Sequence, residues 1–472
     1  MKKGLYIESY GCQMNVYDSL MVEDILRPLG FSAVPHPEDA DIIVINTCHI
    51  REKASEKLYS ALGRIRMIRK KGALIVVAGC VAQAEGEAVL ERAPFVDVVV
   101  GPQSIHTLPE LIMKVTRDAK QVNIEFPVIS KFDSIPTDAR VGRGVSAFVS
   151  VQEGCDKFCT FCVVPYTRGP EYSRSVEDIM AEVEKLADGG TKEVVLLGQN
   201  VNAYHGTYKG DEWDLGRLIQ KVAEVDGIKR IRYTTSHPRD MHSSLYEAHK
   251  YEPKLMPCVH LPVQSGSDSV LRRMNRKHSV KEYIDIIDIL RDARNDIAFS
   301  SDFIVGFPGE TEEDFEGTMN LVRHVGFATS YSFKYSPRPG TPSAEYPDQV
   351  PEEEKSSRLH RLQHLLLDQQ RSFNSSMTGK VIPVLVHGAE SARGANEAFG
   401  KSEYMQPVHI LVDTDPAEYR NKILNVKVLG RGARNSLEGV IFNTTDGYNG
   451  VGSPPPTLHL THKPEPYFYS AH

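Results

Sequence analysis

The chain of 472 residues has no apolar run close to the ~20 residues that a membrane-spanning helix needs, and no charged leader followed by an apolar stretch. We therefore expect a cytoplasmic protein with no membrane partner. The chain also lacks an excess of basic residues, since its formal net charge is -7. This net charge gives no indication of nucleic-acid binding, although a local basic surface is enough for an RNA site.

Cysteine is scarce, but its placement is informative. The chain has seven cysteines, and an odd number without a secretory signal favours free thiols over a disulfide framework. Three of them, Cys155, Cys159 and Cys162, lie within eight residues. Three thiolates on one loop can bind three irons of a four-iron cluster and leave the fourth iron open. A structural zinc site uses four ligands, and no histidine lies beside this loop at ligand spacing.

The spacing Cys-x3-Cys-x2-Cys resembles the signature of the radical S-adenosylmethionine (SAM) superfamily. In that superfamily, SAM binds the open iron through its amino and carboxylate groups. An electron from the cluster then cleaves SAM to a 5′-deoxyadenosyl radical. The resemblance therefore implies an enzyme with SAM as a cofactor.

Residues 1–121 alternate apolar strands with helices. Strands are expected at 4–10, 41–46 and 73–78, each followed by a helical pattern. Strand–helix alternation of this kind predicts a doubly wound parallel sheet, so the fold class is α/β.

Three more cysteines, Cys12, Cys48 and Cys80, each lie just beyond the carboxyl end of one of these strands. In an open parallel sheet these ends lie along one edge, where ligands bind. A single cysteine there could simply be a small buried residue. Three equivalent placements favour a second cluster site. The seventh cysteine, Cys258, lies in an apolar strand and is expected in the core.

Six further strands are expected, mostly separated by helical stretches, at residues 147–151, 193–197, 230–234, 258–262, 300–305 and 330–335. Six units are too few for an eight-stranded barrel but enough for an open (βα)6 partial TIM barrel over 147–378. The cysteine loop follows the first strand, at the mouth where such barrels hold their active sites. Residues 122–146 carry Ser, Pro, Asp and Gly with little periodicity and predict a linker.

The last part of the chain has a different sequence pattern. A helix over about residues 351–377, with leucines at helical spacing, precedes short β-like runs with turn residues. These runs predict a small β-barrel over 379–442. Residues 443–472 are rich in Pro, Gly and Tyr and predict a flexible tail, to which we assign no role.

A more specific resemblance rests on the segments Tyr10–Asn15, Asn46–Cys48 with Arg51–Ala54, and Cys162–Gly169. With the two cysteine sets and the terminal small barrel, they resemble the methylthiotransferases, and within these the MiaB branch, which acts on tRNA. The resemblance covers about residues 4–441. The RimO branch, which modifies a ribosomal protein, differs around the first cysteine and after the third cluster cysteine. The MtaB branch, which acts on threonylcarbamoyl-adenosine, also differs at the first cysteine.

The resemblance implies a reaction and its cofactors. The reaction is methylthiolation of C2 of N6-(dimethylallyl)adenosine at position 37 of tRNA, next to the anticodon. Cys155, Cys159 and Cys162 would hold the SAM-cleaving [4Fe-4S] cluster. The cysteines after the three N-terminal strands would hold an auxiliary [4Fe-4S] cluster that carries the sulfur. SAM would serve both as methyl donor and as radical source.

The resemblance also implies a SAM site at the carboxyl ends of the barrel strands. Its candidate residues are Phe161, Gln199, Asn200, Ser236, Gln264, Ile304, Val305 and Gly306. The alternative is that polar residues at strand ends only satisfy backbone groups, and that the glycine-rich segment after the fifth strand is a turn.

For tRNA contact, the terminal barrel resembles a TRAM domain, an RNA-binding module. Its candidate phosphate ligands are Lys380, Lys401, Lys427, Arg431 and Arg434. A solvated surface is the alternative for these cations. A second basic run, from Arg64 to Lys71, also serves the helix dipole at a helix carboxyl end.

The expected partners are tRNA, a low-potential electron donor of the flavodoxin or ferredoxin kind, and sulfur or iron–sulfur supply proteins. We expect a monomer. Two alternatives stay open from the sequence. One is RimO-like methylthiolation of an aspartate in a ribosomal protein. The other is a non-catalytic iron–sulfur or zinc RNA-binding protein.

Overall fold

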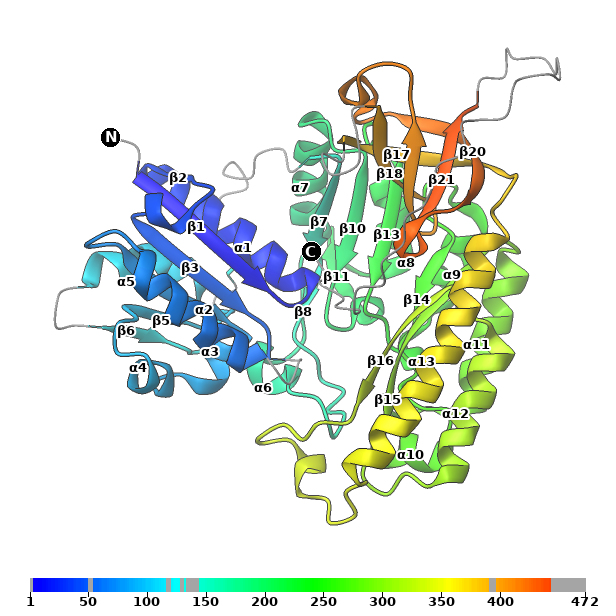
Figure 1. Cartoon of the computed structure of the whole chain (residues 1–472), viewed down its shortest axis with the longest axis horizontal. Coiled ribbons are helices and arrows are strands. Elements are labelled where there is room, and N and C mark those ends of the chain that lie inside the picture. Colours follow the sequence, from blue (N-terminus) through cyan, green and yellow to red (C-terminus); the bar gives the residue numbers. More distant parts are fainter. Residues whose placement is uncertain are drawn as a thin grey trace.

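The computed structural model describes residues 3–49, 54–115, 120–127, 131–132, 144–389 and 396–442. Along the chain they form an N-terminal α/β unit in blue to cyan, a central unit in green to yellow, and a small barrel in orange (Figure 1). The expected tail at 443–472, and part of the expected linker, lie outside the described residues, whereas residues 122–123 of that linker belong to a strand of the N-terminal sheet. No described helix is both long and apolar enough to cross a membrane.

The N-terminal unit is a six-stranded parallel sheet in the order β2-β1-β3-β4-β5-β6. Its strands are β1 Lys3–Tyr10, β2 Phe31–Ala33, β3 Ile42–Thr47, β4 Leu74–Gly79, β5 Val98–Val100 and β6 Gln121–Asn123. Its helices are α1 Gln13–Leu26, α2 Ala54–Ile68, α3 Cys80–Glu85, α4 Ala88–Arg92 and α5 Leu108–Lys114. The expected strands correspond to β1, β3 and β4, whereas β2, β5 and β6 have three residues each and too little sequence to show a period.

Helices cover both faces of this sheet, because its central strands β3 and β4 are buried along almost their whole length and carry apolar side chains on both faces. Ile43 and Ile45 of β3 pack with Leu58 and Leu62 of α2 on one face. The neighbouring Val44 packs on the other face, in the cluster that also holds residues of α1 and α5. The unit is therefore doubly wound, as the sequence predicted.

The central unit is an open arc of six parallel strands. Two three-stranded sheets, β13-β10-β7 and β14-β15-β16, are joined by a parallel bridge between Ile231 and Leu255. The strands are β7 Ser146–Ser150, β10 Glu193–Leu197, β13 Arg230–Thr234, β14 Cys258–His260, β15 Ala298–Val305 and β16 Thr329–Lys334. In the described residues β7 and β16 are not paired with each other, so the barrel stays open, as expected.

The helices of this unit are α6 Val164–Arg168, α7 Val176–Asp188, α8 Leu215–Ala223, α9 Ser243–Tyr251, α10 Asp268–Arg273, α11 Val280–Ala293, α12 Glu312–Val325 and α13 Glu352–Ser375. The short α6 lies at the junction with the N-terminal unit, where it contacts α3 (Figure 1). Two short pairs complete the unit: β8 Gln152–Glu153 with β9 Tyr172–Ser173, and β11 His205–Tyr208 with β12 Asp211–Asp214.

Each barrel strand has two faces because side chains alternate along it. Val194, Leu196 and Phe303 belong to the large core cluster that also contains the helix residues Ile219, Leu290 and Val322. The alternate residues point to the side without these helices, which we call the inner face. On β7 and β10 the helix α1 of the N-terminal unit covers the inner face, since Met14, Tyr17 and Met21 pack with Val195 and Leu197. Figure 1 shows α1 beside β7.

The C-terminal unit is a closed five-stranded barrel in the order β17-β18-β19-β21-β20. Its strands are β17 Val381–Ala389, β18 Glu397–Ser402, β19 Pro407–Leu411, β20 Ile423–Arg431 and β21 Leu437–Ile441. Arg230 donates to the carbonyl oxygens of Lys401 and Pro383, both at 2.9 Å. Arg232 donates to those of Ser402 and Glu403 at 3.0 and 2.6 Å. Because Arg230 begins β13, the small barrel sits at the amino ends of the strands.

Candidate functional site

The three clustered cysteines lie on the loop between β8 and α6, at the carboxyl end of β7. Burial, reinforced by the neighbouring thiols, raises the pKa of Cys155 to about 11 and that of Cys162 to about 12. The Cys159 sulfur accepts a hydrogen bond from Arg276 at 3.6 Å. Gly154 begins the loop at φ +74°, and a Cβ there would lie 1.9 Å from the carbonyl oxygen of Pro170. Only glycine therefore allows this loop to fold so tightly.

Strand register brings the other three cysteines together. Tyr10 of β1 pairs with Thr47 of β3, which pairs with Gly79 of β4. These three residues end their strands at one edge of the sheet. Cys48 and Cys80 follow their strands directly. One residue separates Cys12 from the end of β1, and Cys12 is the N-cap of α1. The sheet edge thus holds all three thiols.

The backbone is tight at this edge. A Cβ on Gly11 would lie 2.2 Å from the Cβ of Cys48, and one on Gly79 would lie 2.3 Å from Oδ1 of Asn46. Both glycines have positive φ, at +132° and +92°. A hydrogen bond with Cys48 lowers the pKa of Cys12 to about 6 against the opposing effect of burial, and nearby Arg168 lowers it further. Cys12 is therefore favoured as thiolate, the form that binds metal, whereas burial raises the pKa of Cys80.

Four charged side chains are buried between the two cysteine sets. Lys131 Nζ lies 2.8 Å from the carboxylate of Asp18 and 2.7 Å from that of Glu153. Arg168 lies 2.6 Å from Asp18 and 3.1 Å from Glu153. All four side chains are at most 2% exposed. We call these four residues the charge quartet. Its two cations balance its two carboxylates.

The quartet joins the two cysteine sets physically. Asp18 is on α1, which begins after Cys12, while Glu153 precedes the cysteine loop and Arg168 ends α6 after it. Burial opposes the charge of Arg168, but Asp18, Cys80 and Glu153 outweigh it and raise its pKa. The Arg168 guanidinium also lies near Cys80, where its charge lowers the pKa of that thiol against the larger opposing effect of burial. One arginine therefore links the loop of the first set to a thiol of the second.

Several expected SAM residues meet at the mouth that holds the cysteine loop. Gln199 Oε1 accepts from the backbone N–H of Gly154 at 2.6 Å. The buried Asn200 Oδ1 and Ser236 Oγ have no hydrogen-bond partner among the described residues. Buried polar atoms are normally satisfied, so a ligand with donors and acceptors fits this place. Gln264 adopts φ +77° at the end of the next strand.

The remaining expected SAM residues divide between two sides of β15. Phe161 and Ile304 pack against one hydrophobic cluster, which joins the cysteine loop to the inner face. Val305 belongs to the core cluster under the helices, so its side chain points away from the mouth. The Gly306 N–H donates to Glu310 at 2.8 Å.

The expected RNA residues are also divided. Lys380, Lys427, Arg431 and Arg434 are exposed on the small barrel. Lys401 is instead half-buried beside Glu193 and Arg232, and burial lowers its pKa. That position favours a role in the interface between the two barrels over a phosphate contact.

The basic run of α2 is engaged within the N-terminal unit. Arg64 pairs with Glu8 at 3.4 Å, and Lys70 pairs with Asp41 at 2.7 Å. Arg66 lies over the ring of Phe95 at 4.9 Å. These contacts use the run within the fold and lend no support to an RNA site there.

Sequence reasoning missed the residues that tie the sites together. Asp18 and Lys131 carry no motif, because their roles depend on segments 113 positions apart. Arg168 lies within the Cys162–Gly169 motif, which was the only signal for it. Arg276 lies beyond α10, and only the fold brings it to Cys159.

The cysteine sets fit iron–sulfur clusters. In the part of the chain that the structure describes, no three His, Cys, Asp or Glu side chains converge as ligands of one metal ion. A four-iron cluster does not need such convergence, because each thiolate binds a different iron. Both cysteine sets combine thiol ligands, glycines that let the backbone approach closely, and nearby cations. These features suit an anionic iron–sulfur group at each set.

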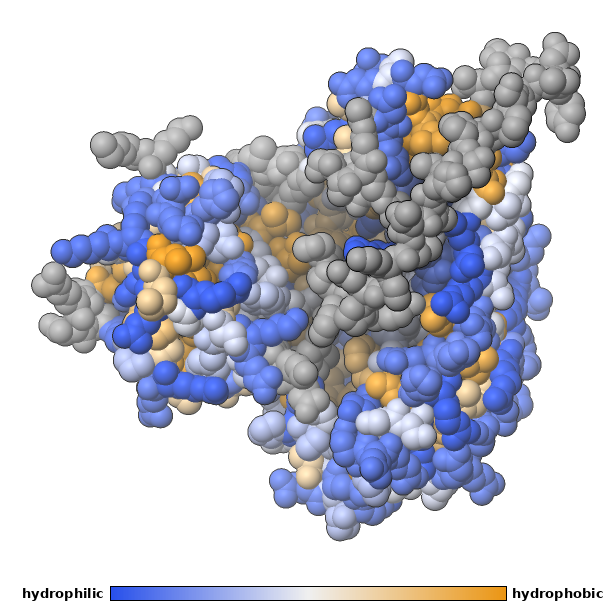
Figure 2. All heavy atoms as spheres, in the orientation of Figure 1, coloured by the Kyte–Doolittle hydropathy of each residue, from blue (hydrophilic) through white to orange (hydrophobic). Residues whose placement is uncertain are grey.

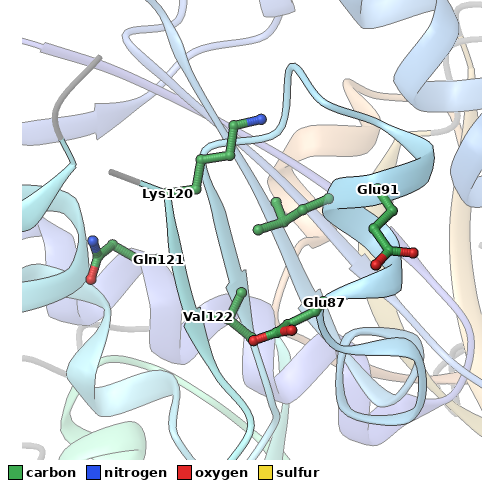
Figure 3. Close-up of a pocket in the computed structure, with 6 residues that line it drawn as sticks. Glu87, Glu91, Lys120, Gln121 and Val122 are labelled. Atoms are coloured by element: carbon green, nitrogen blue, oxygen red, sulfur yellow. The ribbon is translucent and has the colours of Figure 1, made fainter. Parts of the chain in front are cut away.

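Two cavities lie outside the cysteine sets. One of about 470 Å³ is lined by Glu87, Leu90, Glu91, Lys120, Gln121 and Val122 (Figure 3). It lies at the β5–β6 edge of the sheet, away from the cysteines, and carries both signs of charge. The other, of about 360 Å³, is lined by Lys157, Arg239, Asp240 and Lys277. It adjoins the cysteine loop, because Lys157 lies between Cys155 and Cys159.

Known proteins resemble the chain over nearly its whole length. The Radical SAM superfamily profile matches residues 149–322, and the profile of Uncharacterized protein family UPF0004 matches residues 4–101. A tRNA-2-methylthio-N(6)-dimethylallyladenosine synthase of Anaplasma marginale (strain St. Maries) is 82% identical and covers 97% of this chain and 99% of its own. Proteins with this name from Ehrlichia canis (strain Jake) and Wolbachia pipientis wMel are 65% and 60% identical, each covering 93% of this chain and 100% of its own.

A solved structure shares the fold. The radical S-adenosylmethionine methyltransferase TsrM from Kitasatospora setae, with tryptophan substrate and a SAM analogue bound, gives a TM-score of 0.55. It is 11% identical and covers 93% of this chain and 85% of that chain. At this identity the likeness shows the fold alone.

An open parallel barrel with three cysteines on the loop after its first strand defines a radical SAM enzyme, a class that uses a [4Fe-4S] cluster and SAM. The expectation of such an enzyme is thereby confirmed. Within this class, the chain belongs to the family of tRNA-2-methylthio-N(6)-dimethylallyladenosine synthases. The resemblance to the MiaB branch is confirmed.

The charge quartet predicts a large stability difference between two Asp→Asn variants. Asp18→Asn leaves two buried cations facing one carboxylate and is expected to cost about 3–5 kcal/mol in the free energy of unfolding. Asp285→Asn removes a partner of Lys281 from an exposed pair and is expected to cost less than about 1 kcal/mol. Denaturant unfolding followed by circular dichroism measures both. Equal costs would show that the quartet does not stabilise the fold.

Proposed function

We propose that the chain methylthiolates C2 of N6-(dimethylallyl)adenosine at position 37 of tRNA. The observation that carries this proposal is the pair of three-cysteine sets joined by Arg168. The related proteins of A. marginale, E. canis and W. pipientis share one name, and that name supports the same substrate.

Each cysteine set has its own part in this proposal. Cys155, Cys159 and Cys162 would hold a [4Fe-4S] cluster with one iron open for SAM. Cys12, Cys48 and Cys80 would hold a second [4Fe-4S] cluster. When bound, these groups supply radical generation at the first site and sulfur at the second. The chain itself positions SAM, excludes water and keeps the two sites in register.

The substrate explains why no acid–base pair is required. The C2–H of an adenine is not acidic enough for an ordinary side-chain base. A radical can activate it, so the protein groups at the mouth need only bind and orient. The partnerless Asn200 Oδ1 and Ser236 Oγ, with Gln199 beside Gly154, are our candidates for contacts with SAM.

The units divide the work in the same proposal. Residues 1–121 would carry the auxiliary cluster, 122–146 the connection, 147–378 the radical chemistry and 379–442 the tRNA contact. Lys380, Lys427, Arg431 and Arg434 are exposed and suit phosphate groups. The reaction would take place in the cytoplasm, with a sulfur or iron–sulfur supply protein reloading the second site.

An electron donor has a suitable surface beside the cysteine loop. The cavity of about 360 Å³ has three cations, Lys157, Arg239 and Lys277, against one carboxylate, Asp240. Phe158 beside it is 53% exposed. An acidic electron carrier of the flavodoxin or ferredoxin kind complements such a surface, and charge of this kind speeds encounter.

The substrate is tested by mass spectrometry of tRNA nucleosides from a deletion strain with and without this chain. We expect 2-methylthio-N6-(dimethylallyl)adenosine to be absent from the deletion strain and restored by the chain. A Cys155→Ala variant serves as the inactive control, since it removes one thiolate of the first set. Product on a ribosomal-protein aspartate, or no restored nucleoside, would overturn the proposal.

The two-cluster arrangement is tested by iron counting after anaerobic reconstitution. The wild-type chain is expected to hold about eight irons. Replacing either cysteine set by alanine should leave about four. Cys258→Ala, a matched control in β14, should keep about eight because Cys258 belongs to neither set. Bound zinc, or one cluster only, contradicts the arrangement.

The donor surface is tested with two reductants. Arg239→Glu and Lys277→Glu should lower the rate of SAM cleavage driven by reduced flavodoxin about 10-fold relative to the rate driven by dithionite. The effect should shrink at high salt, where exposed charges are screened. Lys250→Glu is the matched control, because Lys250 lies on α9 with its side chain exposed. If the rate of SAM cleavage falls equally with both reductants, the substitutions impair the enzyme itself and not the docking of the donor, and the proposed donor surface is wrong.

A further inference from the structure

The inner face of β14, β15 and β16 carries a set of side chains that nothing above assigns. In the parallel register, His260 pairs with Ser300, Asp302 with Tyr331, and Ile304 with Phe333. Because paired residues and every second residue share a face, all six point to the same side. That side is opposite to Val259, Phe299 and Phe303, which pack under the helices. We call His260, Asp302, Tyr331 and Phe333 the inner platform.

The polar half of the platform is held in place. His260 Nδ1 lies 2.9 Å from the hydroxyl of Ser300, and its Nε2 lies 3.6 Å from a carboxylate oxygen of Asp302. The rings of His260 and Tyr331 meet edge to face at 6.4 Å. Contacts on both ring nitrogens orient an imidazole. The imidazole and carboxylate therefore stand together at a set position beside an aromatic ring.

The aromatic half of the platform is exposed to solvent. Tyr331 is 57% exposed and Phe333 is 43% exposed, whereas Phe299 and Phe303 on the opposite face of the same sheet are at most 3% exposed. Two accessible rings on one sheet face, next to fixed polar groups, are typical of a ligand-binding wall.

The platform faces the space that the two cysteine sets share. The helix α1, whose N-cap is Cys12, covers the inner face of β7 and β10. Ile304, the neighbour of Phe333, packs in the cluster that includes Phe161 of the cysteine loop. Among the described residues, the cluster that α1 forms on the inner face contains no side chain of β14, β15 or β16. Figure 2 shows the surface hollowed between the N-terminal unit and the barrel, with hydrophobic residues in the hollow.

We propose that the inner platform binds the target nucleobase of the RNA, with Tyr331 and Phe333 stacking on the purine and its alkyl group, and with His260 and Asp302 hydrogen-bonding its polar edge. This inference rests on the proposed function and names the surface that holds its substrate. A target base must leave the RNA stack to reach such an enclosed site.

The chemistry of the platform favours a base over other parts of an RNA. Aromatic rings stack on any base, and carboxylate and imidazole groups suit the N–H and ring nitrogens of a purine. The platform holds a carboxylate and no lysine or arginine, so it does not suit a phosphate. The N6–H that remains after alkylation can donate to Asp302.

The test compares two anticodon stem-loops that differ only at the target position. One carries N6-(dimethylallyl)adenosine and the other an abasic site. Tyr331→Ala should raise the Kd for the first about 10-fold and leave the Kd for the abasic stem-loop unchanged, since only the first has a base to stack. Tyr331→Phe keeps the ring and should stay within about twofold of wild type. Tyr251→Ala, at the exposed end of α9, is the matched control.

A second variant distinguishes loss of the aromatic ring from loss of folding. Tyr331→Leu keeps apolar volume but has no ring, so it should behave as Tyr331→Ala, and iron content measured on both variants reports whether they hold their clusters. Asp302→Asn should reduce the preference for the alkylated base over the abasic site, because an uncharged amide accepts more weakly from the N6–H.

Each result decides the inference. Equal loss of affinity for both stem-loops would show a structural or backbone role and overturn it. A raised Kd for SAM with unchanged Kd for the base-containing stem-loop would assign the platform to SAM and also overturn it. If wild type modifies the stem-loop while Tyr331→Ala binds it equally well, the inference fails and the proposed function stands. If wild type forms no product on any tRNA, both fail.

Discussion

A balanced set of buried charges holds this enzyme together. Lys131 and Arg168 meet Asp18 and Glu153 at 2.6–3.1 Å, with all four side chains almost completely removed from solvent. Removing such charges from water is expensive, and attraction offsets the cost only when the geometry is good. Apolar residues could stabilise the same junction. The charged pairs also join α1, β8 and α6, the segments that flank the two cysteine sets, through contacts of 2.6–3.1 Å.

The two cysteine sets are built by different means, and this difference explains much of the architecture. Cys155, Cys159 and Cys162 need only a short loop that Gly154 makes possible. Cys12, Cys48 and Cys80 need three strands of a parallel sheet to end together. Arg168 leaves the first loop and reaches Cys80, so the local site and the long-range site share one side chain. A doubly wound sheet and an open barrel are therefore joined at the ends of their strands, where ligands bind in both folds.

The inner face of the barrel is divided among three functions by the alternation of its strands. At the amino ends, Arg230 and Arg232 bind the small barrel, and Lys401 is half-buried in that contact. Along β7 and β10 the face is covered by α1. Along β14, β15 and β16 it carries the exposed rings of Tyr331 and Phe333. Strand register decides which side chains lie on the inner face, since a shift of a strand by one residue would turn its inner-face side chains toward the helices.

The sequence by itself determined the chemistry, because the ligands of a cluster on one loop show in local spacing and buried strands show as apolar runs. It predicted the α/β class, the open barrel and the family. It did not show the three-residue strands β2, β5 and β6, which are too short to carry a period. Only the tertiary structure decided which polar residues meet. Asp18 and Lys131 are 113 positions apart, and the open face around Tyr331 exists only once three strands are in register. Separation along the chain does not determine separation in space, because packing of the intervening segments brings distant residues together.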